Sequence, residues 1–176
     1  TSFAWEKSIN AASFHHTLEA EFAYLSGENT LNRDLNGHSK FIHLNGVGSA
    51  GKNYLLSYER NNREYSPVGA AVSPDRETID LQWGQYFYQQ MNMLLRAQRY
   101  RDSLSTRNQQ TTKLYGLNIV GIPFKNHPIN VNADLSFREL GNQDDTLDQD
   151  VLAFNLNFAL PVNQQWRNRI AYQWQE

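Results

Sequence analysis

Cysteine is absent from the 176 residues of the chain. This absence excludes a fold held together by disulfide bonds and metal sites built on thiolates. Long apolar runs are also missing, because no segment approaches the roughly 18 to 20 consecutive apolar residues that a membrane-spanning helix needs. The sequence therefore excludes a helical membrane protein.

An excess of one charge sign is missing too, since the formal net charge is −2. Nucleic-acid-binding proteins usually carry a clustered basic face, so we expect no nucleic-acid partner. The four Trp and nine Tyr are assigned to packing or interfacial anchoring rather than to base stacking. The first five residues lack the basic and apolar regions of a signal peptide. We expect that such a peptide was removed or that the chain starts inside a longer protein.

What the sequence does contain is a strict alternation of apolar and polar side chains, clearest in residues 128–176. The apolar positions are Ile129, Val131, Ala133, Leu135 and Phe137, then Leu152, Phe154, Leu156, Phe158 and Leu160, and finally Trp166, Ile170, Tyr172 and Trp174. The polar positions between them include Asn130, Asn132, Asp134, Ser136, Asn155, Asn157, Arg167, Arg169 and Gln173. Successive side chains of a strand point to opposite sides of the sheet, so this pattern predicts amphipathic strands.

The chemistry of the polar side of these strands carries further information. A soluble sandwich usually presents Lys, Glu and Thr to bulk water, whereas this side is rich in Asn, Gln, Asp and Arg. Such a lining is expected inside a water-filled or hydrogen-bonded lumen. We therefore predict that the apolar side faces outward, although alternation by itself fits either orientation.

Weaker alternation extends the pattern to the rest of the chain. We predict earlier strands at 2–7, 13–25, 41–47, 54–58, 79–88, 91–98 and 111–122. Tight turns are predicted at 8–10, 48–51, 89–90, 123–128 and 161–165, and long loops at 26–39, 59–76, 101–110 and 140–149. The main competing interpretation is a helix over 87–101, because Gln, Met, Leu, Arg and Ala favour helices.

Short and long connections thus alternate along about ten predicted strands. Together with aromatic residues near strand ends, this pattern resembles the transmembrane β-barrel proteins of bacterial outer membranes, which have short periplasmic turns, long outer loops and aromatic girdles. The aromatic residues concerned are Tyr24, Tyr58, Trp83, Phe124, Trp166 and Trp174. The predicted fold class is all-β, an antiparallel up-and-down meander over 1–176 that forms a transmembrane β-barrel or part of a larger one. No motif selects one family of such barrels.

The resemblance implies a pore, a translocation conduit or a membrane anchor in the outer membrane of a Gram-negative cell. The implied partners are membrane lipid and lipopolysaccharide, and no enzymatic activity, cofactor or metal is implied. Complete barrels of this kind usually end their last strand in an aromatic residue, whereas this chain ends at Glu176 and its last strand runs toward the long-loop side. We therefore expect a segment of a larger barrel, in which further strands of a longer chain or of partner subunits cover the last strand.

The predicted surfaces are specified residue by residue. The lumen-lining residues are predicted to be Asp80, Gln82, Arg96, Gln98, Asn130, Asn132, Asp134, Asn155, Asn157, Arg167 and Arg169. The lipid-facing residues are predicted to be Leu81, Trp83, Leu135, Phe137, Phe154, Leu156, Phe158, Ile170, Tyr172 and Trp174. The charged members of the first set either line an aqueous path or pair across the lumen.

Three features offer alternative chemistry. His15, His16 and His43 are types of residue that bind metals or act as bases, and His38 precedes Ser39, but none shows a recognisable catalytic or metal-ligand spacing. The loop at 142–150 carries four carboxylates without the spacing of an EF-hand, so calcium binding stays an alternative to simple solvation. The alternative to the membrane function is a soluble or secreted β-barrel that binds a small apolar ligand, with its apolar face inward.

Overall fold

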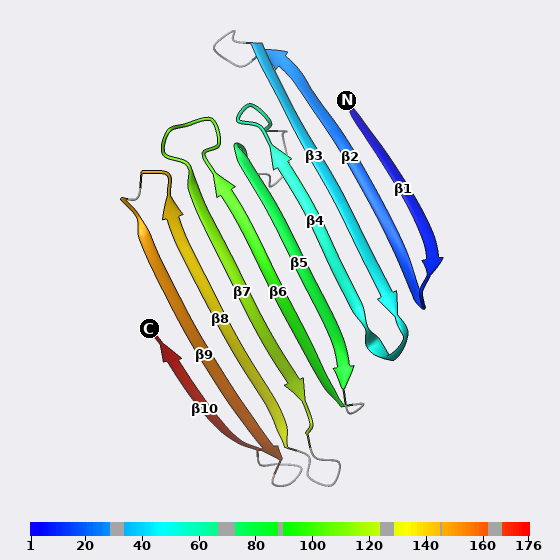
Figure 1. The fold of residues 1–176 in the computed structure, drawn as a ribbon, viewed down its shortest axis with the longest axis vertical. Helices are drawn as coiled ribbons and strands as arrows, with labels where there is room; N and C mark the ends of the chain where they lie inside the picture. Colours follow the sequence, from blue (N-terminus) through cyan, green and yellow to red (C-terminus); the bar gives the residue numbers. More distant parts are fainter. Residues whose placement is uncertain (29–33, 67–72, 88–89, 124–128, 145, 162–166) are drawn as a thin grey trace.

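The computed structural model describes residues 1–28, 34–66, 73–87, 90–123, 129–144, 146–161 and 167–176. Ten strands form one antiparallel sheet in sequence order (Figure 1). They are β1 (Ser2–Ala11), β2 (Phe14–Glu28), β3 (Asp34–Gly48), β4 (Asn53–Asn61), β5 (Arg76–Phe87), β6 (Met91–Asp102), β7 (Gln110–Gly121), β8 (Asn130–Asn142), β9 (Asp148–Pro161) and β10 (Arg167–Gln175). The predicted all-β up-and-down meander is confirmed.

The only helical element in the described part of the chain is η1 (Ser49–Gly51), a single 3-10 turn. Among the described residues no helix has the length and apolar character needed to cross a membrane. The helical interpretation of 87–101 is wrong, because β6 covers most of it and pairs along its whole length with β5 and β7. Pairing with two neighbouring strands here outweighs the helix preference of Met, Leu, Arg and Gln.

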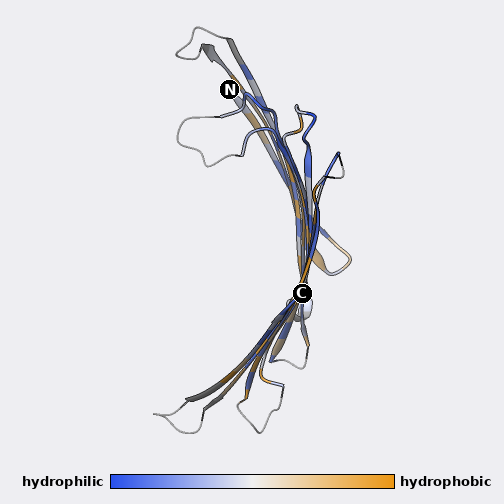
Figure 2. Cartoon of the chain, turned by 90° about the vertical axis from the view of Figure 1, so that its left-hand side faces the viewer, coloured by the Kyte–Doolittle hydropathy of each residue, from blue (hydrophilic) through white to orange (hydrophobic). Residues whose placement is uncertain are grey.

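The sheet is a single bowed layer (Figure 2). Within the described residues the only buried hydrophobic side chains are Ala23 and Met91. A sheet normally buries one face against a second layer, and no such layer exists in the described part of this chain. The alternating side chains therefore produce two open faces rather than a packed core.

The first hairpin departs from the prediction. A turn was expected at 8–10, but β1 continues to Ala11 and the turn consists of Ala12 and Ser13, with φ of 50° and 67°. Two consecutive residues with positive φ match the type I′ geometry that suits the twist of a hairpin. Neither residue is Gly or Asn, so the sequence carries no ordinary signal for this turn.

The predicted long loops are shorter than expected, because the strands continue into them. β2 and β3 pair as far as Glu28 and Asp34, inside the loop predicted at 26–39. Asn61 of β4 pairs with Arg76 of β5, so the ends of the predicted loop at 59–76 are also strand. Backbone hydrogen bonding needs no apolar side chains, so the ladder extends past the alternating residues.

The alternation of connection lengths is only partly correct. It holds from β1 to β7, where the connection at 62–75 is the longest, but the connection at 122–129 exceeds the one at 143–147 on the opposite end of the sheet. The predicted turns at 123–128 and 161–165 fall largely outside the described residues, as does Phe124 of the predicted aromatic girdle. Trp166 of that girdle is outside them as well.

The sheet is open. This agrees with the expectation that the chain is a segment of a larger barrel and does not close one alone. In the described part of the chain β1 pairs only with β2, and β10 pairs only with β9. β1 starts at the end of the sheet where β2 connects to β3 (Figure 1). β10 points toward the same end. That end is called the loop end below, and the opposite end the turn end.

Candidate functional site

The strand register separates the chemistry of the sheet into two faces, since directly paired residues share a face. Leu135 pairs with Phe154, which in turn pairs with Trp174. On the other face Asp134 pairs with Asn155, which pairs with Gln173. We call these the apolar face and the polar face.

The two predicted groups of site residues lie on opposite faces of the sheet. The predicted lipid-facing residues, Leu81, Trp83, Leu135, Phe137, Phe154, Leu156, Phe158, Ile170, Tyr172 and Trp174, share the apolar face. The predicted lumen-lining residues, Asp80, Gln82, Arg96, Gln98, Asn130, Asn132, Asp134, Asn155, Asn157, Arg167 and Arg169, share the polar face. Arg167 and Arg169 are placed by backbone register alone, because their side chains lie outside the described part.

The apolar face is exposed across the middle of the sheet. Leu81 is 46% exposed, Leu95 43% and Leu135 40%, although all three belong to central strands. From β3 to β9 this face carries no charged side chain between the row described next and the turn end of the strands, within the described residues. We call this surface the apolar band. Exposed apolar surface of this kind is typical of regions that contact a partner, a ligand or a membrane.

A line of charged residues borders the apolar band at the loop end. In each strand from β3 to β9 a charged residue lies two positions beyond the last apolar residue of the band, and β6 carries a second one, Arg101, two positions further on. We call this line the charged rim: Lys40, Arg60, Glu77, Arg99, Arg101, Lys113, Glu139 and Asp150. The sequence prediction missed it, although the signal was present as a charge at the end of each alternating series.

The charged rim shifts along the strands as it crosses the sheet. Lys40, Arg60 and Glu77 form one paired row on β3 to β5. Arg99, Lys113, Glu139 and Asp150 form a second row on β6 to β9, two residues nearer the turn end. The border of the apolar band therefore does not follow a single row of paired residues. Such an offset is expected where strands are tilted relative to the axis of a barrel.

The polar face holds hydrogen-bonded networks. Arg96 donates to both oxygens of Asp80, from Nε at 3.3 Å and from Nη2 at 3.0 Å, and Gln82 Nε2 donates to Asp80 Oδ2 at 3.1 Å. Asp80 is only 8% exposed, so these bonds satisfy a carboxylate that is largely removed from water. Asn118 Nδ2 donates to Asn132 Oδ1 at 3.1 Å on neighbouring strands. Asp80 and Arg96 thus form an ion pair between the neighbouring strands β5 and β6.

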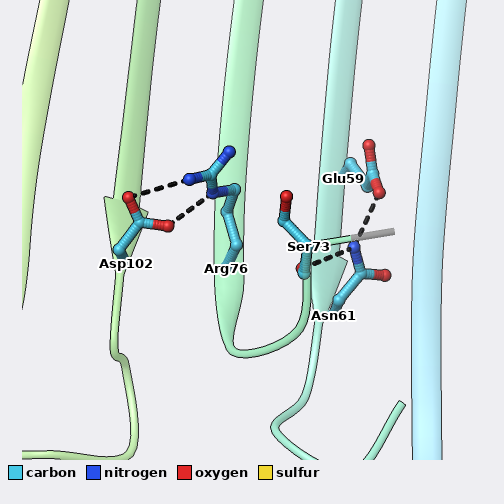
Figure 3. A network of polar contacts seen from close by, with 5 residues as sticks. All are labelled: Glu59, Asn61, Ser73, Arg76 and Asp102. Atoms are coloured by element: carbon cyan, nitrogen blue, oxygen red, sulfur yellow. Dashed lines mark hydrogen bonds and ion pairs between the residues drawn. The ribbon is translucent and has the colours of Figure 1, made fainter. Parts of the chain in front are cut away.

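A second network at the loop end escaped the sequence prediction (Figure 3). Arg76 donates to both carboxylate oxygens of Asp102 from the neighbouring strand, and its guanidinium lies 5.0 Å from the ring centre of Tyr100. Asn61, which is 2% exposed, donates to Glu59 Oε1 at 2.7 Å and to the Ser73 carbonyl at 3.3 Å. The bond from Asn61 holds the β4–β5 connection against the sheet at Ser73, and the Arg76–Asp102 pair joins β5 to β6. Their residues lie in predicted loop segments or next to them, where no register could be assigned.

The histidines have neighbours of their own. His15 Nδ1 lies 2.7 Å from Asn10 Oδ1. His16 of β2 contacts the hydroxyl of Tyr54 of β4 across the intervening strand β3. His43 Nδ1 is 3.8 Å from Glu19 Oε2, which exceeds hydrogen-bond distance, and its buried Nε2 has no hydrogen-bond partner. Within the described residues no group of three or more histidine, aspartate or glutamate side chains is arranged to hold a metal ion.

The acidic loop is organised by an asparagine rather than by its carboxylates. Asn142 Oδ1 accepts hydrogen bonds from the backbone N–H groups of Thr146 at 2.9 Å and Leu147 at 3.0 Å. Asp148 and Asp150 of the predicted loop belong to β9, and Asp145 lies outside the described residues. Calcium binding there stays an alternative to simple solvation of the loop.

Comparison of the chain with protein-family models, with curated proteins and with solved structures finds no match. What the chain does is therefore inferred from the two faces of the sheet.

Proposed function

We propose that this chain is a membrane-spanning β-sheet, part of an outer-membrane β-barrel that acts as a pore, a translocation conduit or a membrane anchor. In this proposal the apolar band contacts lipid, including lipopolysaccharide, and the polar face lines the lumen. Further strands, from a longer chain or from partner subunits, complete the barrel. The proposal assigns no enzymatic chemistry, cofactor or nucleic-acid partner.

The observation that carries the proposal is the apolar band bordered by the charged rim. On β5 the band extends from Ile79 to Phe87 and includes one uncharged polar residue, Gln85; at about 3.4 Å per residue this run measures about 27 Å along the strand. A strand tilt of about 35–45° reduces it to a height of about 19–22 Å, close to the apolar band of about 25 Å in outer-membrane barrels. The border of the band shifts by two residues, or about 7 Å, over the six strand spacings from β3 to β9, or about 29 Å, so the border by itself indicates a smaller tilt of about 13°.

The polar face supports a lumen for a separate reason. Near mid-strand the charges of Asp80 and Arg96 compensate each other, and the side-chain amides of Asn118 and Asn132 bond to one another. Compensated polar groups tolerate a confined environment because no unpaired charge is withdrawn from water. A confined polar interior is compatible with a conduit and equally with a hydrogen-bonded anchor.

One observation favours the alternative function, a soluble or secreted barrel that binds a small apolar ligand. The centre of the apolar face is hollowed by about 640 Å³, a volume within the range of small-molecule pockets. Leu56, Leu81, Trp83, Leu95, Leu117 and Leu135 contribute to its lining. In this alternative the apolar face would turn inward and the polar face would meet bulk water.

Cysteine labelling separates the two functions, because the chain has no cysteine of its own. We would place a single cysteine at Phe154 and, as a matched control, at the adjacent Asn155 on the opposite face. In lipid vesicles the membrane function predicts that the cysteine at 154 reacts with a lipid-soluble probe and resists an aqueous one, while the cysteine at 155 does the reverse. The opposite pattern, or a folded monodisperse protein in buffer without detergent, contradicts the proposal.

A further inference from the structure

The basic part of the charged rim places like charges directly opposite one another. Lys40 of β3 pairs in register with Arg60 of β4, and Arg99 of β6 pairs with Lys113 of β7. All four side chains project from the apolar face at the border of the apolar band. Directly opposed residues have Cβ atoms about 4.5–5.5 Å apart, and like charges in that position destabilise a sheet.

The nearby carboxylates do not balance these cations. Glu77 accepts two hydrogen bonds from Arg101, and Glu139 accepts one from Lys113 Nζ at 2.5 Å. Lys40, Arg60 and Arg99 have no ion-pair partner in the part of the chain that the structure describes, and all three are exposed. The basic part of the rim therefore has three cations that an external anion could satisfy.

The surroundings of these cations restrict the kind of anion. The apolar band begins two residues nearer the turn end on the same strands, at Ile42, Tyr58 and Ala97. A ligand that contacts both surfaces must be amphiphilic, with a negative headgroup at the rim and an apolar chain on the band. Guanidinium groups match phosphate in particular, since their parallel N–H donors fit two phosphate oxygens.

We propose that the basic part of the charged rim, formed by Lys40, Arg60, Arg99 and Lys113, binds phosphate groups of a lipid headgroup whose acyl chains lie on the apolar band. Lys40 and Arg60 form one phosphate site, and Arg99 with Lys113 forms a second. Three strand spacings across the sheet and a shift of two residues along the strands separate them, or about 16 Å in all. The inference rests on the proposed membrane function, and it identifies the lipid that this face selects.

The experiment measures lipid retention by native mass spectrometry on the folded protein in a neutral detergent. The probes are diphosphoryl lipid A, the same lipid with its phosphates removed, and inorganic phosphate as a competitor. The rim variant carries Lys40→Gln, Arg60→Gln and Arg99→Gln. The control variant carries Arg63→Gln, Arg107→Gln and Arg138→Gln, which remove the same charge from exposed positions outside the rim.

The wild type and the control variant should retain the phosphorylated lipid, whereas the rim variant should bind it at least about tenfold more weakly, as expected when charge-assisted bonds to phosphate are lost. All three proteins should bind the dephosphorylated lipid equally. Arg99→Lys keeps the charge and should retain most of the binding. Circular dichroism checks that each variant is folded, and for a variant that misfolds the single Arg99→Gln change replaces the triple one.

Equal loss in the rim and control variants, or no preference for the phosphorylated lipid, overturns the inference. Displacement of the lipid by inorganic phosphate at similar concentrations also overturns it, because the site would then select free phosphate. The outcome is independent of the labelling at 154, since it is measured in detergent. Lipid-soluble labelling at 154 without phosphate selectivity would refute this inference and leave the proposed function intact.

Discussion

Asp80 shows how strongly one polar residue is constrained on the polar face. Its carboxylate accepts two hydrogen bonds from Arg96 and one from Gln82, and little of it is exposed. Asp134 lies on the same face, is more exposed and has no hydrogen bond from a side chain among the described residues. The two aspartates therefore form a matched pair that differs in enclosure and bonding.

We expect Asp80→Asn to lower the free energy of unfolding by about 1–3 kcal/mol, since it weakens bonds to a charged group and leaves Arg96 unbalanced. Asp134→Asn should change it by less than about 0.5 kcal/mol. Urea unfolding of both variants in the same detergent or vesicles measures the difference. Equal effects would show that the Asp80 network contributes nothing specific to stability.

A second residue-scale prediction compares the two faces at neighbouring positions of β9. If the apolar band contacts lipid, Phe154→Arg should destabilise the protein in a bilayer by about 2–4 kcal/mol, the cost of a charge near the membrane midplane. Asn155→Arg should cost little beyond crowding of the lumen. Unfolding in vesicles gives both values, and a larger cost at 155 than at 154 would reverse the assignment of the faces.

At the scale of the element, the turn of the β1–β2 hairpin is formed by residues that do not favour its backbone conformation. Ala12 and Ser13 both adopt positive φ, which costs energy for residues other than Gly, Asn or Asp. Replacing them together by Asn and Gly should stabilise the hairpin by about 1 kcal/mol. Ala12→Pro should destabilise it, because proline fixes φ near −65°. Thermal unfolding measures both, and a neutral Asn-Gly variant would show that the turn is not strained.

The same element shows what a sequence can and cannot predict here. Alternation placed Phe154 and Asn155 on opposite faces correctly, because side chains of a strand alternate regardless of its neighbours. The turn at 12–13 was missed because its conformation is imposed by the pairing of β1 with β2, not by its residue types. The contacts of Arg76 with Asp102 were missed because they depend on register, which the turns set and local composition does not.

The charged rim lies between these cases. Each member is visible in the sequence as a charge that ends an alternating series, such as Lys113 two positions before Tyr115. Its continuity is visible only once the register places Lys113 beside Arg99 and Glu139. The alternation period thus predicted the two faces, whereas the border of the apolar band became visible only from the register of the whole sheet.

At the scale of the whole molecule, the proposed membrane orientation puts the loop end outside the cell. The connection at 62–75 and the acidic loop at 143–147 then face the medium, where exposed polar segments are readily cleaved. Protease added to intact cells should therefore cleave this protein within residues 59–76 and 142–149. Cleavage confined to the turn end, at 48–51 or 161–165, would invert the topology.

The open sheet leads to the last prediction, that a further strand covers β10. The outer edge of β10 has no partner among the described residues, and its Ile170, Tyr172 and Trp174 are exposed. In lipid each unsatisfied backbone group costs several kcal/mol, so an uncovered edge is not stable in a membrane. The added strand comes from more of the same polypeptide or from a partner.

Hydrogen exchange on the folded protein in a neutral detergent tests whether the edge is covered. In a monomeric preparation of residues 1–176, the outward N–H groups of β10 should exchange at least about a hundredfold faster than those of β6, because strand edges open far more readily than central ladders. Addition of the covering strand should slow them to the rate of β6. Slow exchange in the monomer without any added strand would mean that β10 pairs with β1 and that this chain closes its own barrel.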